Sequence, residues 1–213
     1  IRNYQKSLNL KGDAALVYVA LGKCYTMLGK PKQSEAHFRK ALVIDEACAS
    51  AYNALGNLYL FRNQKENAKE FFARACRLEG QNFDYKKDYA GILRVCGETQ
   101  AAIEVLTELV SVAEVDRSLL KDLATAYQEE KRYPEAQATL TRAIQLDPDN
   151  YRLYFALARC YQGSNDHGSA AGILRRVLEL QPDYIDAWML LADIYMRLER
   201  LDQAEESYSK ALS

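Results

Sequence analysis

Small and apolar residues return along this chain at a fixed interval of 34 residues. Counted from Ala15, the interval divides the chain into six blocks without an insertion or a deletion: 15–48, 49–82, 83–116, 117–150, 151–184 and 185–213. Position 8 of the blocks holds Gly22, Gly56, Ala90, Ala124, Ala158 and Ala192. Position 20 holds Ser34, Ala68, Ala102, Ala136, Ala170 and Ala204. A fixed period of this length predicts a solenoid of stacked helical units.

Each block contains the pattern of two helices, and the fourth block shows it most clearly. Its first half has apolar residues at helical spacing: Leu120, Leu123, Ala124 and Tyr127. Its second half has them at Ala136, Leu140, Ala143, Ile144 and Leu146. Pro134 stands where a first helical turn tolerates proline, and the Asp-Pro-Asp-Asn run at 147–150 ends the second helix. Small residues at positions 8 and 20 let two antiparallel helices approach closely, so the pattern predicts an all-α chain of helix pairs.

With these columns and the tyrosines that recur at position 11, the chain resembles the tetratricopeptide repeat, a 34-residue helix–turn–helix unit. The resemblance covers all six blocks, which is about nine-tenths of the chain. It implies a right-handed α-solenoid, or superhelix, of antiparallel helix pairs. The chain departs from the family where Glu46, Gly80 and Glu114 replace a usual proline, and where Lys86 replaces an aromatic residue. Block 83–116 is therefore the least typical of the six.

The two ends of the chain fit the same frame. Residues 1–14 match the second helix of a truncated preceding repeat, and residues 15–213 form the six-repeat domain. The last helix ends near Ser213 without a polar helix to cover it, whereas the terminal repeats of a solenoid normally carry a solvating cap. We therefore expect a fragment of a longer protein. Its ends would leave apolar side chains uncovered and favour end-to-end self-association: Leu8, Leu10, Tyr208 and Leu212.

Composition excludes several classes of partner and points to a compartment. The 28 Lys and Arg residues balance 29 Asp and Glu residues, so the net charge of −1 creates no field that attracts nucleic acid or an anionic membrane. No apolar run reaches the length of a membrane span, and no signal peptide opens the chain. The five cysteines are odd in number and form no CxxC pair. We expect reduced, buried thiols and a cytoplasmic location, with the nucleus as the alternative.

The sequence offers little for catalysis. Its two histidines, His37 and His167, lie in different blocks and have no cysteine or carboxylate partner at metal-ligand spacing. The Ser-Asn-Asp-His-Gly run at 164–168 is typical of a turn between helices, and no glycine-rich phosphate loop follows a strand. We therefore expect no metal, no cofactor and no catalytic residue in this segment.

The family resemblance implies a binding surface, because first helices line the concave face of such solenoids and ligands bind there. The residues expected on that face that carry the most informative side chains are Lys23, Asn53, Asn57, Phe61, Lys87, Arg94, Arg152, Phe155, Arg159, Met189 and Arg197. Asn53 and Asn57 lie four apart on one helix, where an amide can both donate to and accept from a peptide backbone. Phe61 could receive an apolar side chain. The alternative is that Asn57 is ordinary usage and that Phe61 packs against the next repeat.

The arginines of the last two blocks suggest an acidic–apolar partner. Arg152, Arg159 and Arg197 alternate with Phe155 and Met189, a combination that suits a segment carrying both carboxylates and apolar side chains. The alternative is that these arginines pair within the chain, with Asp186 and Asp193.

One specific function of the family, the binding of chaperone tails, is excluded by the residues of this chain at the positions concerned. Chaperone adaptors with this repeat bind the carboxylates of a chaperone tail through a clamp of lysine, asparagine and arginine at set positions in three consecutive blocks. The matching positions of blocks one to three hold Val19, Lys23, Ala54, Asp84 and Asp88, and no later window supplies the set. The sequence therefore predicts a non-catalytic scaffold that binds a protein or peptide other than such a tail. The alternative is a substrate-recruiting or regulatory arm of an enzyme whose catalytic domain lies outside these residues.

Overall fold

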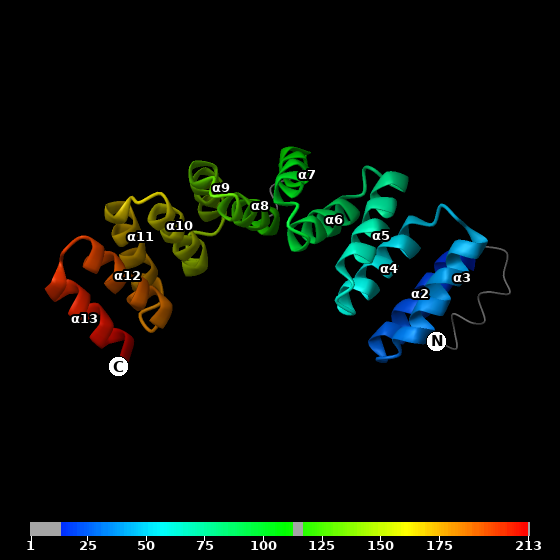
Figure 1. Cartoon of the computed structure of the whole chain (residues 1–213), viewed down its shortest axis with the longest axis horizontal. Coiled ribbons are helices and arrows are strands. Elements are labelled where there is room, and N and C mark those ends of the chain that lie inside the picture. The colour runs from blue at the N-terminus through cyan, green and yellow to red at the C-terminus, as the bar shows by residue number, and fades with distance from the viewer. Residues whose placement is uncertain (1–13, 113–116, 213) are drawn as a thin grey trace. The chain divides into compact units, whose positions relative to one another are not determined.

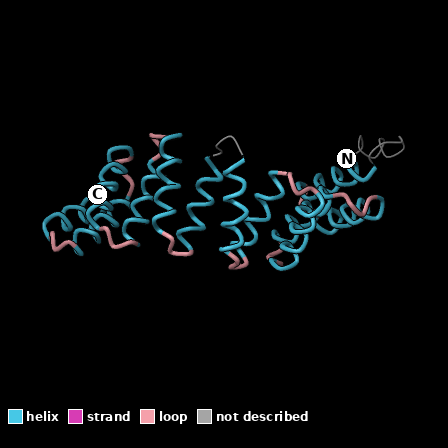
Figure 2. Tube along the Cα trace, turned by 90° about the horizontal axis from the view of Figure 1, so that it is seen from above, coloured by secondary structure: helices cyan, strands magenta, loops and turns pink. Residues whose placement is uncertain are grey.

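The computed structural model describes residues 14–112 and 117–212, and every element in those residues is an α-helix. The helices are α2 (Ala14–Met27), α3 (Pro31–Ile44), α4 (Ala49–Phe61), α5 (Lys65–Leu78), α6 (Phe83–Val95), α7 (Thr99–Val112), α8 (Arg117–Glu129), α9 (Tyr133–Leu146), α10 (Tyr151–Gly163), α11 (His167–Leu180), α12 (Ile185–Arg197) and α13 (Leu201–Leu212). They follow one another as pairs joined by short loops (Figures 1 and 2). The expected all-α fold of tandem helix pairs is confirmed.

The chain divides into two compact units, residues 1–109 and 110–213. The first unit holds the pairs α2–α3, α4–α5 and α6–α7, and the second holds α8–α9, α10–α11 and α12–α13. Residues 1–13, which contain Leu8 and Leu10 and nearly all of the expected truncated repeat, lie outside the described residues.

The helix bounds recur with the 34-residue spacing. Counting from Ala15 defines a frame position for every residue, and each second helix begins at frame position 17: Pro31, Lys65, Thr99, Tyr133, His167 and Leu201. Each first helix ends at frame position 13: Met27, Phe61, Val95, Glu129, Gly163 and Arg197. Between the two helices the chain reverses through a residue at frame position 15 with positive φ, between 56° and 82°: Gly29, Asn63, Gly97, Lys131, Asn165 and Glu199. Beyond that residue, the N–H of Lys30 donates to the carbonyl of Tyr25 at 2.9 Å, which closes the helix end as a Schellman motif does.

Helices within a pair meet where a small residue at frame position 8 faces a large one at frame position 24. Gly22 lies against Phe38, and a Cβ added at Gly56 would fall 2.8 Å from Cδ1 of Phe72. Where frame position 8 is alanine, as at Ala90, Ala124 and Ala158, frame position 24 is the smaller leucine instead: Leu106, Leu140 and Leu174. All of these residues are buried. The combined volume at the contact is thus kept nearly constant from one pair to the next.

Two polar residues stand where the repeats usually have a small or an aromatic residue, and each has a polar partner nearby. Ser34 replaces alanine at frame position 20 and is fully buried, but its Oγ lies 2.6 Å from Oγ1 of Thr26 and shares a hydrogen bond with it. Lys86 replaces the aromatic residue of frame position 4, and its Nζ pairs with Oε1 of Glu108 at 2.6 Å. Both helices of block 83–116, α6 and α7, are present although this block is the least typical in sequence.

Two large side chains of α13 are exposed among the described residues. Tyr208 occupies frame position 24, where the five preceding residues are at most 1% exposed, yet it is 38% exposed, and Leu212 is 89% exposed. End-to-end self-association through this face stays a prediction. Among the described helices, none is long and apolar enough to cross a membrane.

The contact at frame positions 8 and 24 can be tested by changing both of its residues. Gly56→Ala should destabilise the protein, because overpacking against the Phe72 ring costs about 1–3 kcal/mol and exceeds the gain in helix propensity. In a Phe72→Leu background the same change should instead stabilise by about 1 kcal/mol, since alanine and leucine already pair in three other repeats. Urea unfolding of the four proteins measures both effects, and an equal sign in both backgrounds would contradict the contact.

The left-handed residue of the turn gives a second prediction. Glu199 has φ of 58°, which costs a side-chain-bearing residue about 1–2 kcal/mol relative to glycine. Glu199→Gly should therefore raise the free energy of unfolding by about 1 kcal/mol, whereas Glu205→Gly on the exposed face of α13 should lower it by about as much. Urea midpoints measured side by side check the opposite signs.

Candidate functional site

Four of the predicted binding residues line one cavity in the first unit. Lys23 comes from α2 and Asn53, Asn57 and Phe61 come from α4. They surround a cavity of about 430 Å³, named here the N-terminal groove. Its remaining lining residues are Thr26, Met27, Phe38, Ala54 and Leu58. Phe38, Ala54 and Leu58 are buried, so they form an apolar floor, while the residues predicted from sequence form the walls.

The two asparagines form a chain of hydrogen bonds that starts on the next helix pair. Nδ2 of Asn53 donates to Oδ2 of Asp88 at 2.8 Å, and Nδ2 of Asn57 donates to the carbonyl oxygen and Oδ1 of Asn53 at 3.2 and 3.3 Å. The Oδ1 of Asn57 has no partner among the residues described, so it remains an acceptor at the groove wall. Asn53 therefore holds Asn57 in place, whereas sequence reasoning treated both as direct contacts to a peptide.

The groove presents apolar and cationic groups around that acceptor. Phe61 is 81% exposed and Met27 is 89% exposed, so the alternative that Phe61 packs against the next repeat is wrong. The ammonium of Lys23 is exposed and forms no ion pair with any described carboxylate. A segment that fills this groove can thus bury an apolar side chain beside Phe61 and place a carboxylate near Lys23.

Two further predicted residues of the first unit are already engaged. Lys87 and Arg94, both half-buried on α6, each interact with another group of the chain. Neither lines the N-terminal groove.

In the second unit, two predicted arginines line a cavity of about 420 Å³, named here the arginine cavity. Arg159 lies on α10 and Arg197 on α12, and the other lining residues are polar or small: Gln128, Tyr133, Gln162, Gly163 and Asn165. Within residues 14–112 and 117–212, neither arginine pairs with a carboxylate. The alternative pairing with Asp186 or Asp193 is not found there, and Oδ1 of Asp193 instead accepts the hydroxyl of Tyr208 at 2.5 Å. The cavity therefore concentrates two positive charges with amide groups around them, which suits an anion.

The walls of the arginine cavity depend on Gln128 and Gly163, which are not among the predicted binding residues. Nε2 of Gln128 donates to the carbonyl of Ala156 at 3.0 Å and to Sγ of Cys160 at 2.9 Å, which joins α8 to α10. Gly163 lies so close to Tyr133 that an added Cβ would meet the tyrosine ring. The available signal was Gly163 itself, because frame position 13 carries a larger side chain in each of the other repeats.

The remaining predicted residues of the second unit lie outside the arginine cavity. Phe155 packs edge to face against Tyr184, with ring centroids 5.0 Å apart. Arg152 donates from Nε to the hydroxyl of Tyr151 at 3.2 Å, and its guanidinium lies 5.6 Å from the Tyr151 ring centroid. Met189 is 50% exposed. None of these three lines the arginine cavity.

The histidine and cysteine side chains discussed next pack inside the helix pairs, and burial shifts their pKa values. His37 stacks between Tyr18 and Tyr25, and burial together with the nearby Lys40 lowers its pKa. Burial raises the pKa of the Cys76 thiol to about 11 and raises that of Cys160, so both stay protonated at neutral pH. All five cysteines are free thiols. Among described residues, no group of three or more His, Cys, Asp or Glu side chains could hold a metal ion.

Two family models match the chain in separate segments. The model described as tetratricopeptide repeat matches residues 15–48 and 49–82, and the model described as anaphase-promoting complex, cyclosome, subunit 3 matches residues 117–211. The first of these matches coincides with the first two 34-residue blocks.

Curated relatives are similar over part of the chain. The protein O-mannosyl-transferase TMTC1 of Homo sapiens is 25% identical over 130 residues, which is 61% of this chain and 15% of that protein. A UDP-N-acetylglucosamine–peptide N-acetylglucosaminyltransferase of Giardia intestinalis is 28% identical over 141 residues, which is 64% of this chain and 9% of that protein. The chain thus corresponds to a small part of either relative.

Solved structures share the fold at low sequence identity. YrrB, described as a TPR protein with an unusual peptide-binding site, superposes with a TM-score of 0.77 at 21% identity, covering 86% of this chain and 95% of its own. The C-terminal part of a TPR repeat-containing protein from Cytophaga hutchinsonii superposes with a TM-score of 0.81 at 17% identity, covering 99% of this chain and 87% of its own.

Proposed function

The chain belongs to the tetratricopeptide repeat family, and on that basis we propose that it is a protein-binding scaffold whose N-terminal groove holds an extended, acidic–apolar segment of a partner protein. The observation that carries the proposal is the gathering of Lys23, Asn57, Phe61 and Met27 around one cavity of about 430 Å³. Their side chains supply the three contacts that an extended segment needs: an acceptor for a backbone N–H, an apolar surface and a cation.

The arginine cavity extends the same proposal to the second unit. Arg159 and Arg197 have guanidinium groups without a carboxylate partner among described residues, in a cavity of about 420 Å³. We propose that this cavity takes a carboxylate of the bound protein, which agrees with the acidic–apolar character inferred from sequence. Free thiols at all five cysteines support a cytoplasmic or nuclear setting for this function.

A second candidate function is supported by the names of the curated relatives, both of which are sugar transferases. In this alternative the chain is a substrate-recruiting or regulatory arm, and an enzyme domain lies outside residues 1–213. The coding sequence on either side of this segment distinguishes the two functions, because a transferase domain carries its own motifs.

Peptides selected from a random library on the immobilised chain test the N-terminal groove. Asn57→Ala and Phe61→Ala should each weaken the selected peptides by about 5-fold or more, equivalent to about 1 kcal/mol, with thermal stability nearly unchanged. The matched controls Asn67→Ala and Val43→Ala change an exposed amide and an exposed apolar side chain outside the groove, so they should leave affinity unchanged. Equal losses in the controls, or a footprint on α3 and α5 that avoids α4, would refute the groove.

The salt dependence of binding tests the arginine cavity. Arg159→Gln and Arg197→Gln should each weaken an acidic selected peptide by about 3- to 10-fold at low ionic strength, and by less in high salt, where exposed charges are screened. Arg142→Gln removes an exposed arginine from α9 and serves as the control for net charge. The same loss for Arg142→Gln would mean that only overall charge matters.

A further inference from the structure

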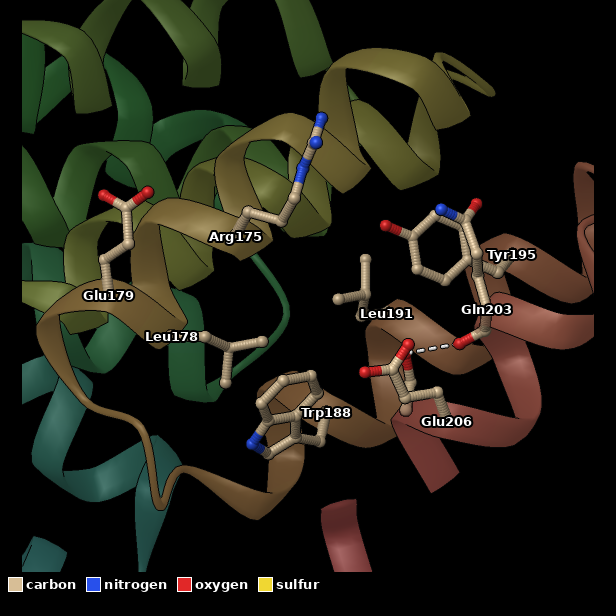
Figure 3. Close-up of a pocket in the computed structure, with 9 residues that line it drawn as sticks. Arg175, Leu178, Glu179, Trp188, Leu191, Tyr195, Gln203 and Glu206 are labelled. Carbon is tan, nitrogen blue, oxygen red and sulfur yellow. Dashed lines mark hydrogen bonds between the residues drawn. The ribbon is translucent and has the colours of Figure 1, made fainter. Parts of the chain in front are cut away.

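A second kind of cavity lies between the last two helix pairs and involves none of the predicted binding residues. It measures about 400 Å³ and lies among α11, α12 and α13 (Figure 3). Leu178, Leu191 and Tyr195 are buried in its wall, Trp188 is half-buried beside them, and Ser207 lies on the α13 side. We name it the Ser207 pocket. Tyr208 and Leu212, the exposed side chains of α13, do not line it.

Other repeats of the chain fill the corresponding space with a large side chain. Frame position 23 holds His37 in the first repeat, where the imidazole stacks on Tyr18 and Tyr25 with centroid distances of 5.8 and 5.0 Å. It holds Phe71 in the second repeat, where the ring lies 6.4 and 5.1 Å from those of Tyr52 and Tyr59. The fifth repeat has Ile173 with Tyr154 and Tyr161 at the same frame positions.

The sixth repeat keeps the aromatic pair and loses the filling side chain. Trp188 and Tyr195 occupy frame positions 4 and 11, but frame position 23 is Ser207, whose hydroxyl donates to the carbonyl of Gln203 at 2.7 Å. The fourth repeat also has a small residue there, Thr139, but it lacks the aromatic pair because frame position 4 is Leu120. The Ser207 pocket is therefore the space that an aromatic ring occupies in the first two repeats.

The last two repeats also lack a carboxylate that the first two repeats have beside the corresponding tyrosine. Between the first two repeats, Arg39 donates to the hydroxyl of Tyr59 at 3.0 Å and pairs with Glu35 at 2.9 Å. Burial acts to raise the pKa of Glu35, but hydrogen bonds from Arg62, Tyr59 and Arg39 outweigh it and keep the pKa below its usual value. This carboxylate is thus a stable anionic part of the cluster at neutral pH.

The last two repeats have the arginine and the tyrosine of that cluster but not its carboxylate. Arg175 and Tyr195 stand at the frame positions of Arg39 and Tyr59, while Ala171 stands at that of Glu35. Throughout the described part of the chain, Arg175 has no ion pair and the hydroxyl of Tyr195 has no hydrogen-bond partner. The nearby Glu179 pairs with Arg176 at 2.8 Å, and Glu206 lies on α13, on the other side of the pocket from Arg175 (Figure 3).

We propose that the Ser207 pocket binds an aromatic side chain of a partner protein that carries a carboxylate next to it in sequence. The ring takes the place that Phe71 has in the second repeat, between Trp188 and Tyr195. The carboxylate takes the place of Glu35 and pairs with Arg175 and the Tyr195 hydroxyl. This site is separate from the N-terminal groove, so the chain has a second surface for a protein partner.

The only tryptophan of the chain, Trp188, reports on this pocket directly. The probe is the acetylated, amidated tripeptide Glu-Phe-Glu, with Gln-Phe-Gln and Glu-Ala-Glu as matched peptides, followed by Trp188 fluorescence and the indole N–H signal in NMR spectra. Glu-Phe-Glu should shift both signals saturably with a Kd of roughly millimolar size, as expected for a small ligand. Gln-Phe-Gln should bind about 3- to 10-fold more weakly. Glu-Ala-Glu should produce no shift. No shift with Glu-Phe-Glu, or an equal shift with Glu-Ala-Glu, would overturn the proposal.

Two variants separate the ring site from the carboxylate site. Ser207→Phe places a ring in the pocket from within, so it should remove the probe response and raise the Tm by about 2–4 °C, whereas Ser209→Phe on the exposed side of α13 should retain the response. Arg175→Gln should abolish the preference for Glu-Phe-Glu over Gln-Phe-Gln, and Arg176→Gln should retain it. Because Arg175 is exposed, its variant remains informative even if Ser207→Phe unfolds the helix pair. An unchanged preference in Arg175→Gln would overturn the assignment of the carboxylate.

Two further measurements distinguish this site from the other surfaces. Asn57→Ala and Phe61→Ala should leave the Trp188 response intact, so a failure of the N-terminal groove and a failure of this pocket are seen separately. Sedimentation of Ser207→Phe should match that of the unchanged protein. Loss of self-association in this variant would mean that a second copy of the chain fills the pocket, which would overturn the assignment to a different partner protein.

Discussion

Packing at frame positions 8 and 24 joins a small residue of the first helix to a large residue of the second helix of a pair. Glycine faces phenylalanine at Gly22 and Gly56, and alanine faces leucine in the next three repeats. Because the interior is close-packed, this pairing fixes how near the two helices approach. The bounds of the helices and the left-handed residue of the turn within each pair recur with the same spacing. Apart from Phe38, which also forms the floor of the N-terminal groove, the residues that line the proposed binding surfaces lie outside this contact.

Each candidate site arises where one repeat departs from that shared arrangement. Phe61 ends α4 as an exposed ring, whereas the same frame position is glycine at Gly163, which admits the Tyr133 ring beside the arginine cavity. Ser207 leaves open the space that Phe71 fills in the second repeat. A repeat protein can thus obtain different binding surfaces from one architecture, because a change at a single frame position alters a cavity without changing the helices around it.

The polar groups in these cavities share one property: part of their hydrogen-bonding or ion-pairing capacity is unused within the described chain. Asn53, which donates to Asp88, holds Asn57 in place, and Asn57 keeps a free acceptor. Arg159 and Arg175 form no ion pair with a described carboxylate. By contrast, Arg39 and Lys86 occupy positions where the chain itself supplies the carboxylate. Cations that pair with a carboxylate of the chain stabilise the fold, whereas cations without such a partner among the described residues are candidates for binding a partner protein.

The sequence alone determined the helix pairs and the positions that are buried, because a period of 34 residues and the helical spacing within it are visible in the order of residues. It also identified Lys23, Asn53, Asn57 and Phe61 as neighbours on one face. Only the tertiary structure decided which of the predicted side chains are available. Lys87 and Arg94 are engaged with other groups of the chain. Phe155 packs on Tyr184 and Asn53 is held by Asp88, because these partners, 29 and 35 residues away, are set by packing between repeats. The Ser207 pocket likewise required the structure, since a serine reveals a cavity only when the ring positions around it in other repeats are known.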